Sequence, residues 1–212
     1  MDQNIRIAVI GGTGKAGKYL IKELLSQGFR IRALMRNPEK LELHPLLEKV
    51  KGDVRDYESI YNLINGCDVV ISTLGQRKGE EPVFSVSAKN IIKAMSALQV
   101  KRYIVLTGLT LDISSDRKRI ANKMRSQTMK LFFGKIIHDK EKEYKIIEES
   151  SLDWTVVRVP FIGLSDERKD VKSSLTDCDG RIISSASLAL FLIDQIEDRN
   201  YIRKAPFIWD KE

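Results

Sequence analysis

Short, continuous apolar runs alternate along this chain with longer stretches in which apolar residues recur every three or four positions. A short apolar run is typical of a strand that is buried on both faces, and the wider spacing is typical of an amphipathic helix. The runs predict strands over 5–10, 29–35, 49–51, 68–72, 102–106 and 154–159, and a small edge strand over 205–209. The spacing predicts helices over 15–27, 57–64, 86–98, 139–149 and 185–196, and a short helix over 42–47 that Pro45 interrupts.

The predicted strands and helices alternate, and the connections between them are short. This order predicts a doubly wound α/β architecture, in which a parallel sheet carries helices on both faces. A length of 212 residues suits one domain over 1–212, because a second domain of ordinary size would be crowded. The segment after Pro160 is less regular and predicts a small cap.

The charge excess is confined to one segment. The net charge is +7, from 36 Lys and Arg against 29 Asp and Glu. Residues 117–137, called here the basic segment, contain seven Lys and Arg and no acid. The seven positive charges of this segment equal the net charge of the whole chain. No nucleic-acid motif accompanies it, so we expect no nucleic-acid partner.

The remaining composition excludes several classes of protein. With Cys67 and Cys178 as its two cysteines, the chain cannot form a disulfide scaffold or a Cys-rich zinc site, and no cluster has metal-ligand spacing. No apolar run approaches the length of a transmembrane helix. The first residues lead directly into a strand, so we expect no secretory signal and a cytoplasmic protein.

Three glycines follow the first predicted strand. Gly11, Gly14 and Gly17 form a G-x-x-G-x-x-G pattern that opens the first helix. Such glycines allow a sharp turn, a close approach of the backbone to a pyrophosphate, and tight packing of helix on strand. The helix N-terminus then presents amide groups to the phosphates. The pattern lies where this mechanism requires it, and it predicts a dinucleotide site.

Residues at the ends of the next strands indicate which dinucleotide binds. Arg36 follows the second strand, where an acid would favour NAD and an arginine favours the 2′-phosphate of NADP(H). Lys40 is a candidate helper, and Arg36 could instead be a solvated surface residue. Asp53 follows the third strand and either accepts a hydrogen bond from the adenine amine or stabilises a turn. Thr73 to Gly75 close the fourth strand at the same sheet edge.

These motifs together resemble the atypical short-chain dehydrogenase/reductase family, in the branch of NmrA-like proteins and biliverdin-IXβ (flavin) reductase. The resemblance covers nearly the whole chain, and its most specific part is the run from Ser150 to Pro160. Its other marks are GGTGKAG at 11–17, RNP at 36–38, GDV at 52–54, LG at 74–75 with Pro82 and Asn90, YIVLTG at 103–108, Lys140 and ISSASLA at 183–189.

The resemblance implies a Rossmann-like fold, bound NADP(H), and a substrate pocket formed in part by the C-terminal cap. Carried over position by position, it implies the following cofactor-binding residues: Gly11, Thr13, Gly14, Lys15, Ala16, Arg36, Asp53, Val54, Thr73, Leu74, Gly75, Thr107, Lys140, Pro160 and Phe161.

The chain departs from the family at the positions whose side chains transfer protons in catalysis. Ile136 stands where the parent superfamily has the tyrosine of its Tyr-x-x-x-Lys pair, although Lys140 is present. Phe161 stands where the flavin reductase has a histidine. The usual acid–base groups are therefore missing, and Thr107, Lys140 and Tyr144 are the candidates that remain for a catalytic role.

Two functions fit these observations, with an isomerase or epimerase as a third. The first is an NADPH-dependent reductase of flavin-, quinone- or tetrapyrrole-like acceptors, with a small substrate that is anionic or flat and aromatic. The second is a non-catalytic, NADP(H)-sensing regulator that binds a protein partner. The basic segment either forms a mobile cover over the pocket or meets an acidic substrate, an anionic membrane surface or a partner protein.

Overall fold

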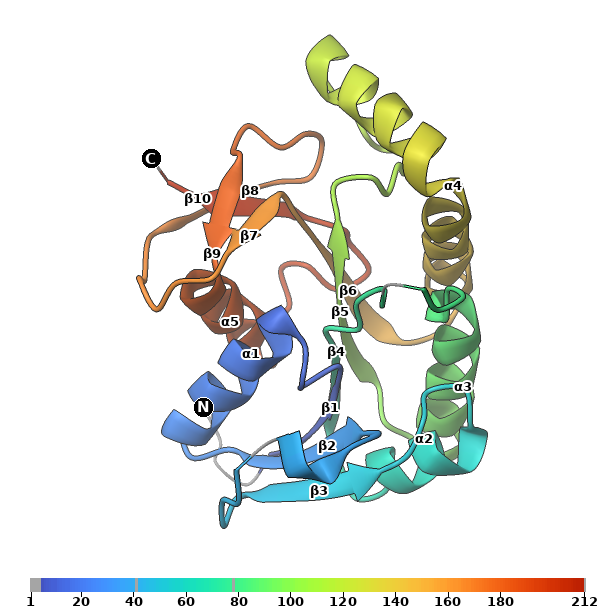
Figure 1. The fold of residues 1–212 in the computed structure, drawn as a ribbon, viewed down its shortest axis with the longest axis vertical. Helices are drawn as coiled ribbons and strands as arrows, with labels where there is room; N and C mark the ends of the chain where they lie inside the picture. Colours follow the sequence, from blue (N-terminus) through green and yellow to red (C-terminus); the bar gives the residue numbers. More distant parts are fainter. Residues whose placement is uncertain (1–4, 41, 78, 212) are drawn as a thin grey trace.

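The computed structural model describes residues 5–40, 42–77 and 79–211, and the side chains of Lys40 and of residues 120–132 lie outside the described part. An eight-stranded sheet with the order β3-β2-β1-β4-β5-β6-β10-β8 forms its centre (Figure 1). The strands are β1 (Arg6–Ile10), β2 (Arg30–Met35), β3 (Leu47–Lys51), β4 (Val69–Ser72), β5 (Arg102–Gly108), β6 (Asp153–Val159), β8 (Val171–Ser174) and β10 (Phe207–Asp210). All neighbours pair in parallel except β8, which runs antiparallel to β10.

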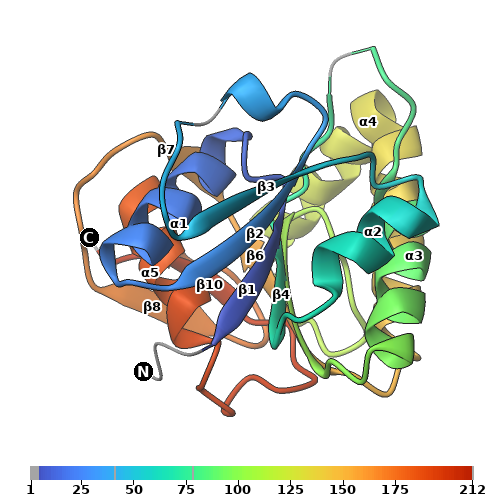
Figure 2. The same cartoon turned by 90° about the horizontal axis from the view of Figure 1, so that it is seen from below.

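Helices cover both faces of the sheet, as the alternating pattern predicts. On one face lie α1 (Lys15–Ser26) and α5 (Ser185–Asp194), and on the other α2 (Tyr57–Ile64), α3 (Phe84–Ala97) and α4 (Ile120–Glu148) (Figures 1 and 2). Residues Pro38–Lys40 form a short 3-10 helix, η1. The doubly wound, Rossmann-like architecture is confirmed.

The two cores follow from the alternation of side chains along each strand. In β1, Ile7 and Val9 pack with α1 and α5, whereas Ala8 and Ile10 pack with α2 and α3. All four side chains are fully buried, as expected of a strand covered on both faces. The strand order reverses at β1, which lies between β2 and β4, and ligands bind beside such a reversal at the carboxyl edge of a sheet.

The C-terminal part differs from its prediction in one respect. The segment predicted as an edge strand, 205–209, forms β10 inside the sheet, because β8 pairs along its outer side. The sequence of β8 is Val171-Lys172-Ser173-Ser174, and its polarity gave no strand signal. A two-stranded ribbon of β7 (Phe161–Gly163) and β9 (Ile182–Ser184) completes the predicted small cap.

The helix predicted over 42–47 is wrong. Residues 42 and 43 have no regular structure, and a turn at Pro45 and Leu46 leads into β3. The imidazole Nδ1 of His44 accepts a hydrogen bond from the amide of Leu46 at 3.1 Å. Pro45 has no amide hydrogen to give a helix, which favours the turn.

Helix α4 is much longer than the helix predicted over 139–149. It starts at Ile120 and is kinked at Phe133, whose φ of −125° and ψ of 28° are not helical. Its N-terminal half extends beyond the rest of the fold (Figure 1). No helix in the described part of the chain is both long and apolar enough to cross a bilayer.

Candidate functional site

The glycine turn has the geometry that its spacing predicts. Gly11 has a φ of +80°, which favours glycine. A Cβ on Gly17 would lie 2.2 Å from the carbonyl oxygen of Gly11, so only glycine lets α1 pack against the turn. Gly14 is the N-cap of α1, and no side chain caps the helix there. The first amide groups of a helix lack intrahelical acceptors, so those of Lys15 and Ala16 are available to an anion.

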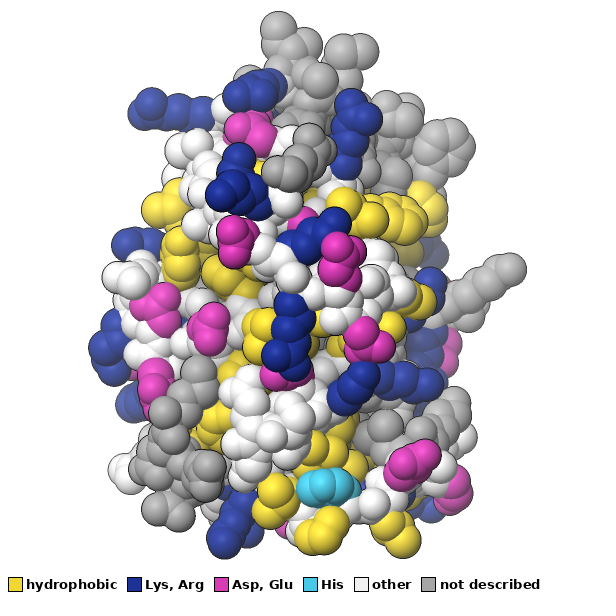
Figure 3. Space-filling model, turned by 90° about the vertical axis from the view of Figure 1, so that its left-hand side faces the viewer, with side chains coloured by type: hydrophobic (Ala, Val, Ile, Leu, Met, Phe, Trp, Pro, Cys, Tyr) yellow, Lys and Arg dark blue, Asp and Glu magenta, His cyan; other side chains and the backbone are white. Residues whose placement is uncertain are grey.

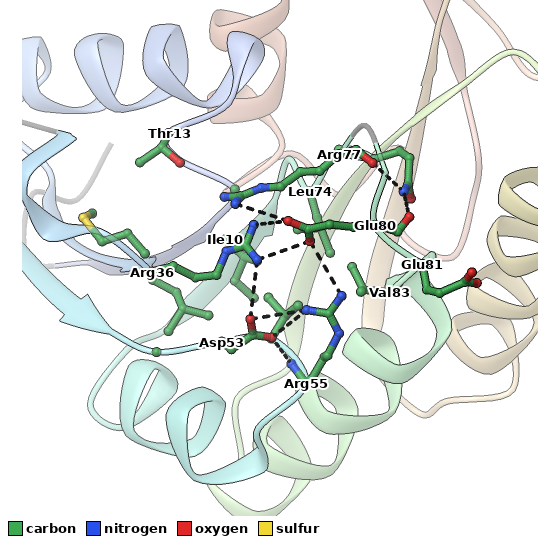
Figure 4. Close-up of a pocket in the computed structure, with 17 residues that line it drawn as sticks. Ile10, Thr13, Arg36, Asp53, Arg55, Leu74, Arg77, Glu80, Glu81 and Val83 are labelled. Atoms are coloured by element: carbon green, nitrogen blue, oxygen red, sulfur yellow. Dashed lines mark hydrogen bonds and ion pairs between the residues drawn. The ribbon is translucent and has the colours of Figure 1, made fainter.

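A cavity opens at the carboxyl edge of the sheet, beside β1 (Figure 4). The structure brings together seven of the predicted cofactor residues in its wall, from four separate loops. They are Gly11, Thr13, Arg36, Asp53, Val54, Leu74 and Gly75.

The same cavity contains charged residues that the sequence did not indicate. Arg55, Gln76, Arg77, Glu80 and Glu81 also line it. Arg55 lies two residues from Asp53 and could have been found as a cation next to the GDV motif. The other four belong to the loop between β4 and α3, which has no recognisable pattern, so nothing in the sequence pointed to them.

Arg36 points into the cavity, where its guanidinium binds a carboxylate of this chain. Its Nη2 donates to Oε1 of Glu80 at 2.9 Å and its Nη1 donates to Oε2 at 3.2 Å. Asp53 lies further away, with its Oδ2 at 4.0 Å from Nη1 of Arg36. Arg36 therefore lies where the 2′-phosphate prediction needs a cation, and its role towards NADP(H) stays a prediction.

The loop after β3 is held in place by two side chains. The Asp53 carboxylate accepts a hydrogen bond from the amide of Arg55 at 2.9 Å, so the turn-stabilising alternative for Asp53 is present in the structure. Asn90 of α3 donates from Nδ2 to the carbonyl oxygens of Val54 and Arg55, both at 3.0 Å. These bonds fix the backbone of the cavity floor.

Other predicted cofactor residues lie along the same sheet edge, outside the cavity wall. Thr73 is buried, and its Oγ1 donates to the carbonyl of Ile10 at 3.2 Å. Thr107 is buried near the end of β5, opposite Arg158. Phe161 follows β6 with 71% of its surface exposed, which is unusual for phenylalanine.

Lys140 and Tyr144 do not face one another as a pair. Lys140 donates from Nζ to Oε2 of Glu143 at 2.8 Å and lies 3.8 Å from the centre of the Phe84 ring, between α4 and α3. Tyr144 donates to Oε1 of Glu148 at 2.9 Å and packs edge-on against Trp154. Burial raises the pKa of Tyr144, and the bond to Glu148 raises that pKa further. Their catalytic and cofactor roles stay predictions.

A second cavity of about 750 Å³ adjoins the first. Gln76, Arg77, Glu80 and Glu81 line both cavities, so the β4–α3 loop forms the wall between them. The opposite wall comes from Thr110 and from the kinked part of α4, including Phe133 and Ile136. Ile136, which replaces the superfamily's tyrosine, thus lies in this wall.

A buried ion network anchors the segment between β5 and α4. Arg158 of β6 is fully buried and donates from Nη1 to both carboxylate oxygens of Asp116, at 2.7 and 2.8 Å. It also donates from Nε and Nη2 to the carbonyl of Ala205 at 2.9 and 2.7 Å. Lys118 lies beside it, 3.7 Å from Asp116 and 2.7 Å from Asp112.

Several cations of the basic segment have acidic partners, which the sequence did not show. Lys118 pairs with Asp112 and Asp116, Arg119 with Asp179 at 3.1 Å, and Lys135 with Glu81 at 3.6 Å. Acids from elsewhere in the chain therefore partly balance the charge of these three residues. The side chains of Lys123, Arg125 and Lys130 lie outside the described part, so the predicted pocket cover stays a prediction.

The surface on the α1 and α5 side is mixed in charge. Figure 3 shows Lys and Arg side chains interspersed with Asp and Glu over that face. This agrees with a charge excess that comes from the basic segment.

A doubly wound sheet, a glycine turn beside its reversal point and a cavity at its carboxyl edge define a dinucleotide-binding protein. A family model described as NAD(P)H-binding matches residues 11–199, and the chain belongs to that family. The resemblance to atypical short-chain dehydrogenases/reductases is thus confirmed.

A curated protein is similar along nearly the whole chain. The divinyl chlorophyllide a 8-vinyl-reductase of Arabidopsis thaliana is 25% identical over an alignment of 230 positions, gaps included, which covers 95% of this chain and 52% of the relative. This chain spans about half or less of the length of the curated relatives that it matches first.

Solved structures share the fold at low identity. A short-chain dehydrogenase/reductase from Veillonella parvula in complex with NADP superposes with a TM-score of 0.79 at 15% identity, covering 97% of this chain and 94% of the other. A candidate NADH-flavin reductase from Streptococcus pneumoniae superposes with a TM-score of 0.79 at 21% identity, covering 98% and 100%. At these identities the likeness shows the fold alone.

Proposed function

We propose that this protein is an NADPH-dependent reductase of flat, conjugated acceptors of the flavin, quinone or tetrapyrrole kind. The observation that carries the proposal is the pair of adjoining cavities. One has the glycine turn and Arg36 in its wall, and the other, larger one has Ile136 in its wall. The names of the chlorophyllide vinyl-reductase and of the candidate flavin reductase support an acceptor of this class.

The residues of the first cavity fit NADP(H). A Cβ on Gly11 would lie 2.7 Å from the backbone of Thr73, and one on Gly17 would lie 2.2 Å from the carbonyl oxygen of Gly11, so both glycines permit the tight turn and the close helix packing that a dinucleotide site requires. The amides of Lys15 and Ala16 would bind the phosphates, and Arg36 would bind the 2′-phosphate. Val54 and Leu74 would enclose the adenine. The bound cofactor would supply the hydride. The residues of this chain would position the cofactor and provide the positive charge that binds its phosphates.

Two positions at which the family carries a proton donor hold apolar residues in this chain, which favours acceptors that need no protein acid. Reduction of a ketone or aldehyde forms an alkoxide, which normally takes a proton from a positioned side chain. Ile136 and Phe161 carry no such proton. Flavins and quinones spread the added charge over a conjugated ring system, so they depend less on that proton. A cavity of about 750 Å³ is large enough for such rings.

Cofactor binding tests the first half of the proposal. A charge-assisted bond from Arg36 to the 2′-phosphate contributes about 1.5–3 kcal/mol, so NADPH should bind at least about tenfold more tightly than NADH. Arg36→Ala should remove most of this difference in titration calorimetry at low salt. Arg30→Ala is the matched control, because Arg30 starts the strand that Arg36 follows and lies at its opposite end. Equal affinities of the wild-type protein for both dinucleotides would contradict the assignment.

Turnover tests the second half. NADPH oxidation, followed by absorbance, should proceed with flavins or small quinones and be negligible with simple aldehydes. General acid catalysis typically raises a rate by about 10²–10⁴-fold. The reduction of aldehydes would be slower by that factor, because Ile136 and Phe161 donate no proton. Tight NADPH binding without turnover of any acceptor would refute the reductase and favour the NADP(H)-sensing regulator. Efficient turnover of a simple aldehyde would mean that a side chain other than Ile136 or Phe161 supplies the proton.

A further inference from the structure

Three arginines surround a single carboxylate in the first cavity (Figure 4). Glu80 binds Arg36 through both carboxylate oxygens, at 2.9 and 3.2 Å. Nη2 of Arg55 lies 3.7 Å from its Oε2, and Nη1 of Arg77 lies 3.8 Å from its Oε1. The Arg55 guanidinium also bridges to Asp53 at 3.3 Å. The cluster therefore has the chemistry of an anion site that an anion of this chain already fills.

Glu80 reaches the cluster from a different loop than Arg36 and Arg55. It lies 44 residues from Arg36, in the loop between β4 and α3. Gln76 holds this loop by donating from Nε2 to the carbonyl of Glu80 at 2.6 Å and to that of Arg77 at 2.8 Å. The position of Glu80 is thus set by the loop itself and does not depend on Arg36 alone.

Both partners of the central ion pair are within reach of solvent. The side chains of Arg36 and Glu80 are 33% and 36% exposed. The cavity measures about 70 Å³, far below the roughly 300–1,000 Å³ of ligand sites. A nucleotide can therefore bind here only if the side chains of the cluster rearrange. An ion pair that is about one-third exposed can exchange one anion for another at modest cost.

We propose that Glu80 weakens the preference of this protein for NADPH over NADH, by competing with the 2′-phosphate of NADPH for Arg36 and Arg55. This inference rests on the proposed function. A 2′-phosphate carries about −1.5 to −2 charge, so it displaces the carboxylate from the arginines and repels it. The ribose 2′-hydroxyl of NADH is neutral and donates a hydrogen bond that a carboxylate accepts. Glu80 thus weakens the binding of NADPH and strengthens the binding of NADH. It therefore reduces the ratio of NADPH to NADH affinity that Arg36 creates.

Glu80→Gln tests the proposal, since it keeps the shape of the side chain and removes its charge. Affinities for NADPH and NADH are measured by titration calorimetry at low salt. NADPH should bind about three- to tenfold more tightly to the variant, while NADH binding stays unchanged or weakens. The affinity for adenosine 2′,5′-bisphosphate should rise by the same factor in the variant, and the affinity for adenosine 5′-monophosphate should not rise. This comparison assigns the effect to the 2′-phosphate.

Glu58→Gln is the matched control. Glu58 is exposed in the first turn of α2 and is not among the residues that line either cavity. Its substitution changes the net charge equally. The ratio of NADPH to NADH affinity should stay within about twofold of that of the wild-type protein.

The outcomes separate this inference from the proposed function. If Glu80→Gln binds NADPH with an unchanged ratio of NADPH to NADH affinity, the role of Glu80 is overturned and the proposed function is not. An equal change of this ratio in Glu58→Gln overturns the role of Glu80 as well. Failure of the wild-type protein to bind either dinucleotide overturns the proposed function and the inference with it. Glu80→Ala serves as a second variant, and thermal unfolding of each protein confirms that the fold is kept.

Discussion

Replacing Asp116 with alanine should destabilise the fold far more than the loss of an ordinary surface charge. Asp116 supplies both bonds to Nη1 of Arg158, whose side chain is fully buried. Burial lowers the pKa of Arg158, and the hydrogen bond to Asp116 opposes this shift. Without Asp116, the guanidinium keeps its carbonyl partners but loses the charge that compensates its own.

The size of the effect follows from this burial. Breaking a buried ion pair by removing one partner costs about 3–5 kcal/mol, because the other charge stays buried without compensation. For a protein of this size, such a loss lowers Tm by about 6–20 °C. Urea unfolding, followed by circular dichroism and tryptophan fluorescence, measures the free energy, and an unchanged slope indicates the same folded and unfolded states.

Two further variants test the reasoning. Asp112→Ala removes the nearer acidic partner of Lys118. Because the Lys118 ammonium keeps Asp116 at 3.7 Å and the carbonyls of Leu109 and Leu111, the loss should be smaller than in Asp116→Ala. The double variant Asp116→Ala/Arg158→Met removes the buried charge as well, so it should be more stable than Asp116→Ala alone. If Asp116→Ala costs less than about 1 kcal/mol, the buried-charge argument is refuted. If the double variant is no more stable, the loss comes from the other partners of Asp116, which are the amide of Ile113 and the ammonium of Lys118.

Two other substitutions give simple tests of the structure. Gly17→Ala places a Cβ 2.2 Å from the Gly11 carbonyl oxygen, so it should lower the free energy of unfolding by about 1–3 kcal/mol and weaken NADPH binding. Gly134→Ala is the control, because the added atom meets nothing within 4 Å, and it should have neither effect. Thermal unfolding and titration measure both. Burial raises the pKa of the Cys67 thiol to about 12, against 9.0 for an ordinary thiol, which leaves about 1,000-fold less thiolate at pH 8. In a Cys178→Ser background, a thiol reagent should therefore label Cys67 only in denaturant, and rapid labelling of the native protein would contradict its burial.

The sequence by itself determined those features that depend on neighbours along the chain. The apolar spacing predicted α2 at its observed bounds, and the apolar runs located the six strands from β1 to β6. The glycine spacing predicted the turn after β1, because φ and Cβ clearance are local properties. The position of Arg36 at the cavity followed from its place after β2, since parallel strands end at the same sheet edge.

Only the tertiary structure decided which charges meet. Glu80 binds Arg36 across 44 residues, and Asp116 binds Arg158 across 42. Lys140 was expected at the cofactor, and the packing of α4 on α3 places it beside Glu143 and Phe84. Strand β8 has little apolar character and exists through its pairing with β10. An ion pair or a strand pair forms between groups that the chain path brings together, and neither apolar spacing nor a local motif carries that information.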